Sequence, residues 1–473
     1  MSRRDISSSS HARKEGWKTW EIDDNDLPQL KVNQTRLMAE LHHTCQWGSG
    51  VPWKDATDPS TQTGMSRLAL SDADKAARDW FVETTRSLGC DVTVDAMGNI
   101  FAVRPGSYGP KGIPTYCGSH LDTQPAGGRY DGILGVLAGV EMLRVMKEHD
   151  VETAYPVGVV NWTNEEGARF PISMVSSGVW AGEIPLERAH ALKEVGGSGA
   201  TMRDELERIG YLGTVPASYE AMPMAAHFEL HIEQGPILEA ENRRIGIVEG
   251  VQAYRWYTVE VVGREAHTGT TPFSARADAL LTAARMIAYS HEIAVRKYAL
   301  ASTGILSLSP GSVNTVPGKV TFSLDIRAPF DKTLDDIERT LFQFDFRQIV
   351  SSEYTKGREL SFTWTVDSVS PATRFQKSCI EVAKSAAESL GKESSRNVRV
   401  MTSGAGHDSV YTSRRCPTSM IFVRCRDGVS HNPEEYASPE DCATGAEVLL
   451  QSVLRYDRLR YFKDNKSSDK PIR

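Results

Sequence analysis

The feature that most constrains the fold is an alternation of short β-branched runs with longer helical runs. Short apolar runs at residues 115–118 and 157–162 flank a longer apolar stretch with helical character at 133–146. Such alternation is typical of βαβ units, which place parallel strands in one sheet and helices on its faces. Ahead of this region, Ser71 and Asp74 have the spacing of a capping box, which predicts that a helix begins there.

The pattern changes between about residues 246 and 366. Strands with polar alternation are expected at 257–262 and 320–326, and helices near 275–293 and 334–344. Strands and helices in this order, without the regular βαβ alternation, predict an inserted α+β unit. In its first helix, Arg276 and Asp278 are expected to form a structural ion pair.

The first pattern then returns in the last part of the chain. A helix is expected near 375–390, followed by strands at 398–402 and 420–425 and by a closing helix. The start of that last helix carries a good N-cap, a proline at its first position and an acid at its third. These residues are Ser438, Pro439 and Asp441.

The length of the chain predicts two domains. At 473 residues it exceeds the size at which a single hydrophobic core keeps growing. We therefore predict an α/β fold, in which both ends of the chain build a domain with a mixed, mainly parallel sheet and a smaller α+β domain is inserted. The expected limits are a polar tail at 1–27, the first domain at 28–246 and 367–463, the inserted domain at 247–366, and a polar tail at 464–473.

Composition narrows the classes of function. A formal net charge of −7 argues against nucleic-acid binding, which needs a basic surface, and no apolar stretch approaches the length of a membrane span. Seven cysteines without a CxxC pair fit reduced thiols in a cytoplasmic enzyme, with Cys90, Cys117 and Cys425 in the core. Residues 1–16 lack the apolar segment of a secretory signal, and the acidic run at 21–26 disfavours an organellar transit peptide. A small-molecule substrate is expected.

Polar residues follow the predicted strands, where open α/β sheets bind their ligands. In GSHLDT, residues 118–123, His120 and Asp122 share one face of an extended chain, so Asp122 can orient the His120 imidazole. In GGRYDG, residues 127–132, Asp131 stands between glycines just before a helix. Taken alone, a structural histidine and a helix-capping aspartate are the simpler interpretations.

Two neighbouring acids and two further histidines extend this set. Glu165 and Glu166, in NWTNEEGARF, follow a buried strand, where adjacent carboxylates are costly unless a cation or an arginine neutralises them. His231 lies in ELHIEQGP and His431 in GVSHNP. Mixed nitrogen and oxygen donors of this kind suit zinc or a similar divalent ion. The five candidate ligands are His120, Asp131, Glu166, His231 and His431.

In their order along the chain, these motifs resemble those of the M20 metallopeptidase superfamily. The resemblance rests on TNEEGARF, ELHIEQGP, GREAHTGTTP, NTVPG and SGAGHDS, and it covers nearly the whole chain. Within the superfamily, the chain is similar to the carbamoyl-amino-acid hydrolase and allantoate amidohydrolase branch. Residues 67–70, 79–81 and 97–103 further resemble the yeast type of β-alanine synthase, or β-ureidopropionase.

The resemblance implies a two-metal site. Asp131 would bridge two divalent ions, zinc being expected and manganese, cobalt or nickel the alternatives. His120 and His231 would complete the site of one ion, and Glu166 and His431 that of the other. Two such ions polarise a carbonyl and activate water, so Glu165 would act as the acid–base residue, with Asp122 assisting as a further catalytic residue.

The resemblance also implies a set of substrate contacts. His267 would support the tetrahedral intermediate in the active site of the other subunit of a homodimer. The inserted domain would form the dimer contacts and act as a lid. Arginine engages a carboxylate with two parallel hydrogen bonds, so Arg327 and Asn314 would clamp the substrate carboxylate. A surface ion pair is the alternative for Arg327. The remaining contacts, to the ureido or amide group, would come from Gln234, Gly406 and His407.

The expected reaction is hydrolysis of an N-carbamoyl-β- or α-amino acid to the amino acid, carbon dioxide and ammonia. The yeast-like features favour N-carbamoyl-β-alanine, a substrate of pyrimidine degradation. Allantoate or ureidoglycolate hydrolysis is the first alternative, because those relatives share most of the motifs. A metallopeptidase or aminoacylase is a further class, against which His231 and Gln234 count, since peptidase relatives usually carry an acid where His231 stands. A non-catalytic binding protein would be expected to lose Glu165 or a ligand.

Overall fold

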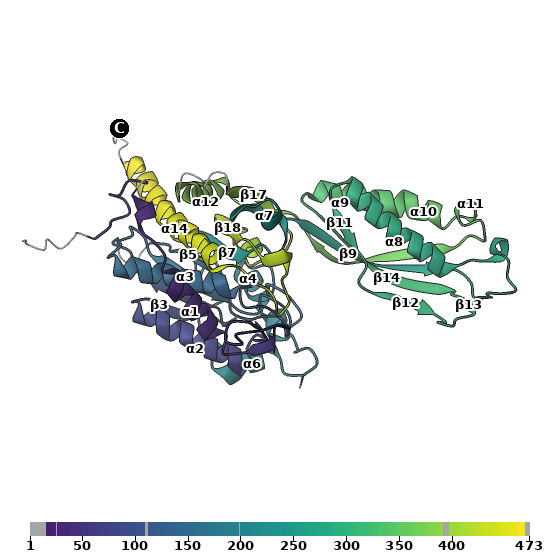
Figure 1. Ribbon diagram of the computed structural model, residues 1–473, viewed down its shortest axis with the longest axis horizontal. Coiled ribbons are helices and arrows are strands. Elements are labelled where there is room, and N and C mark those ends of the chain that lie inside the picture. Colours follow the sequence, from purple (N-terminus) through teal and green to yellow (C-terminus); the bar gives the residue numbers. More distant parts are fainter. Residues whose placement is uncertain (1–15, 25, 109–111, 198, 391–396, 469–473) are drawn as a thin grey trace, which may run out of the picture. The chain divides into compact units, whose positions relative to one another are not determined.

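The computed structural model describes residues 16–24, 26–108, 112–197, 199–390 and 397–468. The chain forms two compact units (Figure 1). Unit 1 comprises residues 1–249, 375–401 and 406–473, and unit 2 comprises residues 250–374 and 402–405. Within the described residues, no helix combines the length and the hydrophobicity that a bilayer crossing requires.

A mixed sheet forms the centre of unit 1. Its neighbouring strands follow the order β8-β18-β7-β5-β6-β4-β3, and β17 also pairs with β8. The four strands from β18 to β6 are parallel to one another, whereas β8, β4 and β3 are antiparallel to their neighbours. The bounds are β3 Asp91–Val94, β4 Ile100–Arg104, β5 Thr115–His120, β6 Val157–Trp162, β7 Ala226–Ile232, β8 Ile245–Val251, β17 Val398–Ser403 and β18 Thr418–Val423. The predicted α/β class, with a parallel sheet core, is confirmed.

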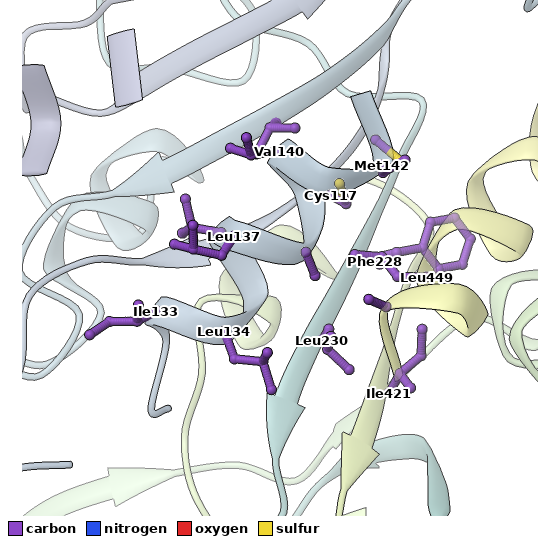
Figure 2. Close-up of a cluster of buried hydrophobic side chains, with 14 of the residues drawn as sticks. Cys117, Ile133, Leu134, Leu137, Val140, Met142, Phe228, Leu230, Ile421 and Leu449 are labelled. Carbon is purple, nitrogen blue, oxygen red and sulfur yellow. The ribbon is translucent and has the colours of Figure 1, made fainter. Parts of the chain in front are cut away.

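Long helices cover this sheet. Every residue of β5, β6, β7 and β18 is buried, as expected for parallel strands covered on both faces. Figure 2 shows side chains of α3 in one cluster with residues of β5, β7, β18 and α14. The longer helices are α1 Gln34–Thr44, α2 Asp72–Ser87, α3 Ile133–Glu148, α12 Lys377–Ser389 and α14 Pro439–Ser468. The shorter elements are α4 Val175–Trp180, α5 Leu186–His190, α6 Met202–Ile209, α7 Ile237–Ala240, α13 Ser409–Thr412, β1 Ser49–Pro52 and β2 Thr63–Met65.

The caps of two helices test the sequence predictions. The Ser438 hydroxyl accepts the Asp441 N–H at 3.1 Å, which confirms the predicted start of α14. At α2, the Ser71 hydroxyl accepts the Asp74 N–H at 3.2 Å, as predicted. The reciprocal half of that capping box is wrong, because the Asp74 carboxylate accepts the Leu70 N–H at 2.7 Å and pairs with buried Arg78 instead.

Unit 2 contains an antiparallel sheet in the order β11-β14-β9-β15, with β12 also paired to β14. Burial alternates along β14, so one face of the sheet packs against helices and contributes to a separate core. The strands of this sheet are β9 Ala253–Val262, β11 Leu300–Ser302, β12 Leu306–Ser309, β14 Lys319–Ala328 and β15 Ser361–Ser370. The short strands β10 Ala266–His267 and β13 Thr315–Val316 pair with each other, and β16 Thr373–Arg374 pairs with the end of β8. The helices are α8 Ala279–Arg296, α9 Asp331–Glu338, α10 Phe346–Ile349 and α11 Ser352–Thr355.

Two details of unit 2 correct the sequence analysis. The helix expected from residue 275 begins at Ala279, because Asp278 caps it by accepting the Leu281 N–H at 3.0 Å. Arg276 does not pair with Asp278. Its guanidinium donates to the carbonyls of Thr268 and Thr271, at 2.6 and 2.8 Å.

Some residues predicted to lie in polar tails are part of the packed structure. Thr19 is buried and donates from its hydroxyl to Asp457 at 2.5 Å, and Leu27 is also buried. At the other end, α14 extends to Ser468. The rest of the predicted tails, residues 1–15 and 469–473, lies outside the described residues. All seven cysteines are unpaired and buried, which confirms the core positions predicted for Cys90, Cys117 and Cys425.

Candidate metal centre and active site

The predicted ligands come together where the parallel strands of unit 1 end. His120 is the last residue of β5, Glu166 follows β6, and His231 is next to last in β7. Asp131 lies in the loop before α3, and His431 follows β18. Because the carboxyl ends of parallel strands lie at one edge of a sheet, residues that are far apart in the sequence meet there.

The first donor group consists of His120, Asp131 and His231, each with one ligand atom within 4.8 Å of the others. The Nε2 atoms of His120 and His231 lie 3.7 and 2.9 Å from Oδ1 of Asp131. All three side chains are almost fully buried. The two histidine nitrogens therefore converge on one oxygen of Asp131.

The second donor group consists of Asp131, Glu166 and His431. Nε2 of His431 lies 3.3 Å from Oδ2 of Asp131 and 3.3 Å from Oε2 of Glu166. Asp131 thus presents one oxygen to each group, which is the arrangement of a carboxylate that bridges two ions. The nitrogen and oxygen donors of both groups fit divalent cations such as zinc.

Two glycines make the Asp131 loop possible. Gly132 has φ +67°, and a Cβ there would lie 2.3 Å from Cε1 of the His120 ring. A Cβ on Gly128 would lie 2.3 Å from the side chain of Glu435. Asp131 itself does not cap α3: the N-cap residue is Gly132, which has no side chain to cap the helix. The capping interpretation of Asp131 is therefore wrong.

Backbone carbonyls orient the two buried imidazoles. Nδ1 of His120 donates to the carbonyl of Asp122 at 2.9 Å, and Nδ1 of His231 donates to the carbonyl of Ile232 at 2.9 Å. Both rings therefore direct Nε2 toward Asp131. The Asp122 carboxylate, at 3.9 Å from Nδ1 of His120, instead accepts the N–H groups of Glu165 and Glu166, each at 3.3 Å. Asp122 thus orients His120 through its backbone carbonyl, and not through the carboxylate that the sequence predicted.

Glu165 lies beside the metal donors without belonging to either donor group. Its side chain is 9% exposed, and its Oε2 lies 3.6 Å from Nε2 of His120. Burial first, and then the neighbouring carboxylates of Asp408 and Glu166, raise the pKa of Glu165 well above its usual range. A raised pKa makes a carboxylate a better proton acceptor.

Asp131 has the opposite electrostatic environment. Burial alone would raise its pKa, but the charge and hydrogen bond of His231, with contributions from His431 and His120, hold the pKa of Asp131 well below its usual range. Its carboxylate form is therefore strongly favoured, which is the form that binds cations.

The three predicted ureido contacts surround the same region. Nε2 of Gln234 donates to Oδ2 of Asp131 at 2.8 Å. The His407 ring packs edge-on against the His231 ring, with 4.5 Å between centroids, and burial together with the charge of His231 lowers the pKa of His407 to about 3. Gly406, beside it, faces Met174, whose Cε would lie 2.9 Å from a Cβ at position 406.

The other three predicted substrate residues belong to unit 2. His267 in β10 is exposed, and the N–H of its neighbour Thr268 donates to the carbonyl of Asn314 at 2.9 Å. Arg327, on β14, pairs with Asp325 at 2.9 Å and lies over the Tyr254 ring. The ion pair expected as the alternative for Arg327 is therefore present, and it leaves about a third of the arginine side chain exposed.

Several buried polar residues around the centre were not predicted from the sequence. The carboxylate of Glu435 accepts the N–H groups of Tyr130 and Asp131, each at 3.0 Å. The carboxylate of Glu229, the first residue of ELHIEQGP, accepts the hydroxyls of Ser119 and Ser409, each at 2.7 Å. For Glu229 the available signal was an acid in a strand whose other polar residues are two histidines. For Glu435 the only signal was that it lies four positions after His431 in the sequence.

Comparison with known proteins identifies the family. The description "Peptidase family M20/M25/M40" applies to the family model that matches residues 116–455. This match covers well over half of the chain, and the chain therefore belongs to the M20/M25/M40 peptidase family.

The relatives narrow this assignment to amidohydrolases. An N-carbamoyl-L-amino-acid amidohydrolase from Rhizobium meliloti is 40% identical over 430 residues, which are 90% of this chain and 96% of the relative. A ureidoglycolate hydrolase from Oryza sativa subsp. japonica is 34% identical over 405 residues, 83% of this chain and 80% of the relative. The crystal structure of an amidase of the hydantoinase/carbamoylase family from Burkholderia multivorans matches with a TM-score of 0.82 and 41% identity, over 91% of this chain and 99% of that one. The predicted family and the predicted amidohydrolase class are confirmed.

Proposed function

We propose that this chain is a two-metal amidohydrolase that cleaves the ureido C–N bond of an N-carbamoyl amino acid, releasing the amino acid, carbon dioxide and ammonia. The observation that carries the proposal is the pair of donor groups that share Asp131, with Glu165 beside them but outside both. The similarity to N-carbamoyl-L-amino-acid amidohydrolases supports this choice of substrate class.

The two donor groups support this choice of metal ligands. His120, His231 and Asp131 would hold one divalent ion, and Asp131, Glu166 and His431 the other, with zinc expected and manganese, cobalt or nickel as alternatives. Bound there, the ions would polarise the ureido carbonyl and acidify water. Glu165 takes the proton of the attacking water on its carboxylate and transfers it to the leaving nitrogen. Burial, together with the carboxylates of Asp408 and Glu166, raises the pKa of Glu165, which favours its acceptance of this proton.

Further substrate contacts are proposed for residues of each unit. Gln234, Gly406 and His407 would contact the ureido group, while Arg327 and Asn314 would bind the substrate carboxylate. We further propose that the protein is a homodimer, in which the inserted domain at 247–366 acts as the dimerisation lid and His267 acts on the site of the partner subunit. A positively charged fork such as that of Arg327 matches a carboxylate geometrically, so acids should be preferred over uncharged ureas.

Allantoate or ureidoglycolate hydrolysis is the second candidate. The similarity to a ureidoglycolate hydrolase favours it specifically. Both substrates carry a ureido group and a carboxylate, so the same contacts would bind them. They differ from N-carbamoyl amino acids in the substituents between these two groups.

Steady-state kinetics tests the proposal. Ammonia release would be measured with N-carbamoyl-β-alanine, N-carbamoyl-α-amino acids, allantoate and ureidoglycolate, and dipeptide cleavage separately, using protein loaded with zinc, cobalt or manganese. Glu165→Gln serves as the control, since it keeps the size of the side chain and removes its proton-accepting carboxylate. We expect hydrolysis of a carbamoyl amino acid that disappears in Glu165→Gln. Turnover of the dipeptide alone, or activity that survives in the control, would contradict the assignment.

A further inference from the structure

Glu435 connects two distant parts of the candidate metal centre. Its carboxylate is 1% exposed. One oxygen accepts the N–H groups of Tyr130 and Asp131, each at 3.0 Å, from residues about 300 positions earlier in the chain. The other oxygen accepts the hydroxyl of Ser430 at 2.8 Å. The same carboxylate therefore contacts the loop that carries Asp131 and the loop that carries His431.

Ser430 extends this connection to the bridging carboxylate. Its hydroxyl lies 3.2 Å from Oδ2 of Asp131, the oxygen that faces His431. A hydroxyl carries one proton, so Ser430 donates fully to only one acceptor at a time. The shorter distance, to Glu435, shows which acceptor it mainly serves. The hydroxyl then lies next to Asp131 without competing for the lone pairs that would bind cations.

A buried carboxylate in this place is energetically costly. It is removed from water and lies close to Asp131, and both effects oppose its charge. Three hydrogen bonds compensate, and Gly128 leaves room for the side chain, since a Cβ there would lie 2.3 Å from it. A costly group that three donors and a glycine accommodate points to a role beyond the stability of the fold.

We propose that Glu435 and Ser430 are positioning residues that hold Asp131 and His431 in ligating geometry. The inference rests on the proposed two-metal function and adds the residues that preorganise its centre. Two consecutive N–H groups bound to one oxygen fix the peptide from which the Asp131 side chain extends. The bond to Ser430 fixes the residue immediately before His431.

The effect should fall mainly on the second donor group. The His431 side chain is 50% exposed and its backbone has φ +52°, in the left-handed region, so this ligand depends on its loop for support. His120 and His231 are held at strand ends by carbonyls of their own segments. Loss of Glu435 should therefore weaken one of two bound ions more than the other.

Metal binding measures this directly. Wild type, Glu435→Ala, Glu435→Gln and Ser430→Ala would be stripped with a chelator, dialysed against buffered zinc and analysed for bound metal, without any activity assay. In Glu435→Ala we expect the affinity for one of the two ions to fall about 10- to 100-fold, the usual effect of losing a group that orients a ligand. Glu435→Gln retains an acceptor for the two N–H groups and should restore most of the affinity.

Asp457 offers a matched control in the same unit. Its buried carboxylate accepts the N–H groups of Ala154 and Tyr155, at 2.8 and 2.9 Å, and the hydroxyl of Thr19 at 2.5 Å. Glu435 has the same kinds of donor, two consecutive N–H groups and one hydroxyl. The N–H groups bound by Asp457 lie just before the start of β6, whereas the metal ligands lie at the other ends of the parallel strands. Asp457→Ala should lose a comparable amount of stability and bind both ions as the wild type does.

The outcomes distinguish the two-metal function from the positioning role of Glu435 and Ser430. A wild-type protein that binds fewer than two ions would overturn the proposed function. Two ions in the wild type and unchanged affinity in Glu435→Ala, or an equal loss in Asp457→Ala, would overturn the positioning role while leaving the function intact. If Glu435→Ala does not fold, Ser430→Ala decides: weaker binding of one ion supports the role, and wild-type affinity rejects it.

Discussion

The sheets of the two units differ in how their strands are buried. This difference affects where each unit can place titratable side chains and how strongly their pKa values shift. The parallel strands β5, β6 and β7 of unit 1 are buried along their whole length. In unit 2, β14 alternates between buried and partly exposed residues, and most of β15 is exposed. The candidate ligands of unit 1 and Glu165 lie at or after the ends of its buried strands, where burial and neighbouring charges shift the pKa values of Glu165 and Asp131 strongly. The polar residues of β14 and β15 in unit 2 lie along partly exposed strands instead.

The largest effect should come from the buried strand ends of unit 1. Glu165→Gln is expected to lower kcat about 10²- to 10⁴-fold, the usual contribution of an acid–base group. Because the change removes a carboxylate whose pKa is raised by burial, the melting temperature should stay the same or rise. Kinetics and thermal unfolding of the same preparations check both points. A large drop in melting temperature would mean that the activity loss reports unfolding instead.

The core beneath those strand ends should show the next largest effect. Leu137 of α3 is fully buried in the cluster of Figure 2. Leu137→Ala should reduce the free energy of unfolding by about 2–5 kcal/mol, because the change loses buried area and leaves a cavity. Urea denaturation followed by fluorescence measures the loss. A change below about 1 kcal/mol would show that this helix can shift to close the cavity.

In unit 2, the expected effect is on substrate binding. Arg327→Lys keeps the charge but loses the planar fork, so KM for a carbamoyl amino acid should rise about 10- to 100-fold, as for the loss of a charged hydrogen bond worth about 1.5–3 kcal/mol. Arg255→Lys is the matched control in the same sheet, because Arg255 pairs with Asp335 and Glu338. Equal KM values for both variants would argue against a carboxylate clamp at Arg327.

The smallest effect should come from the exposed strand β15 of unit 2, and a buried valine in β14 of the same sheet provides the comparison. Val366 in β15 is 50% exposed, so Val366→Thr should change the free energy of unfolding by less than about 0.5 kcal/mol. Val320 in β14 is fully buried, and Val320→Thr should cost about 1–3 kcal/mol because it buries a hydroxyl. Chemical denaturation compares the two variants. A loss at Val366 as large as that at Val320 would show that this face is covered in solution.

The elements of the parallel sheet were predictable because burial leaves a strong local pattern. The strand expected at 157–162 is β6, Val157–Trp162, and the helix expected at 133–146 is most of α3, Ile133–Glu148. Cap positions were less certain, since a polar side chain often has several acceptors or donors within reach. Asp74 illustrates this, because it bonds to Leu70 and Arg78 rather than completing the capping box.

The candidate site shows the same division. The types and order of the motif residues indicated which side chains meet, and the structure brings the five predicted metal ligands into two donor groups. The sequence did not indicate which atoms orient the ligand side chains. The bond from His120 to the Asp122 carbonyl, rather than to its carboxylate, depends on the path of the backbone after β5.

The sequence by itself determined the class of fold, the family and the chemical character of the site, because hydrophobic periodicity and motif residues are local properties of the chain. Only the tertiary structure decided which distant segments support one another. The contact of Glu435 with the N–H groups of Tyr130 and Asp131 joins residues about 300 positions apart, and it also explains why position 128 is glycine. Such pairings arise from the order of strands in the sheet, which brings loop ends together regardless of their separation along the chain.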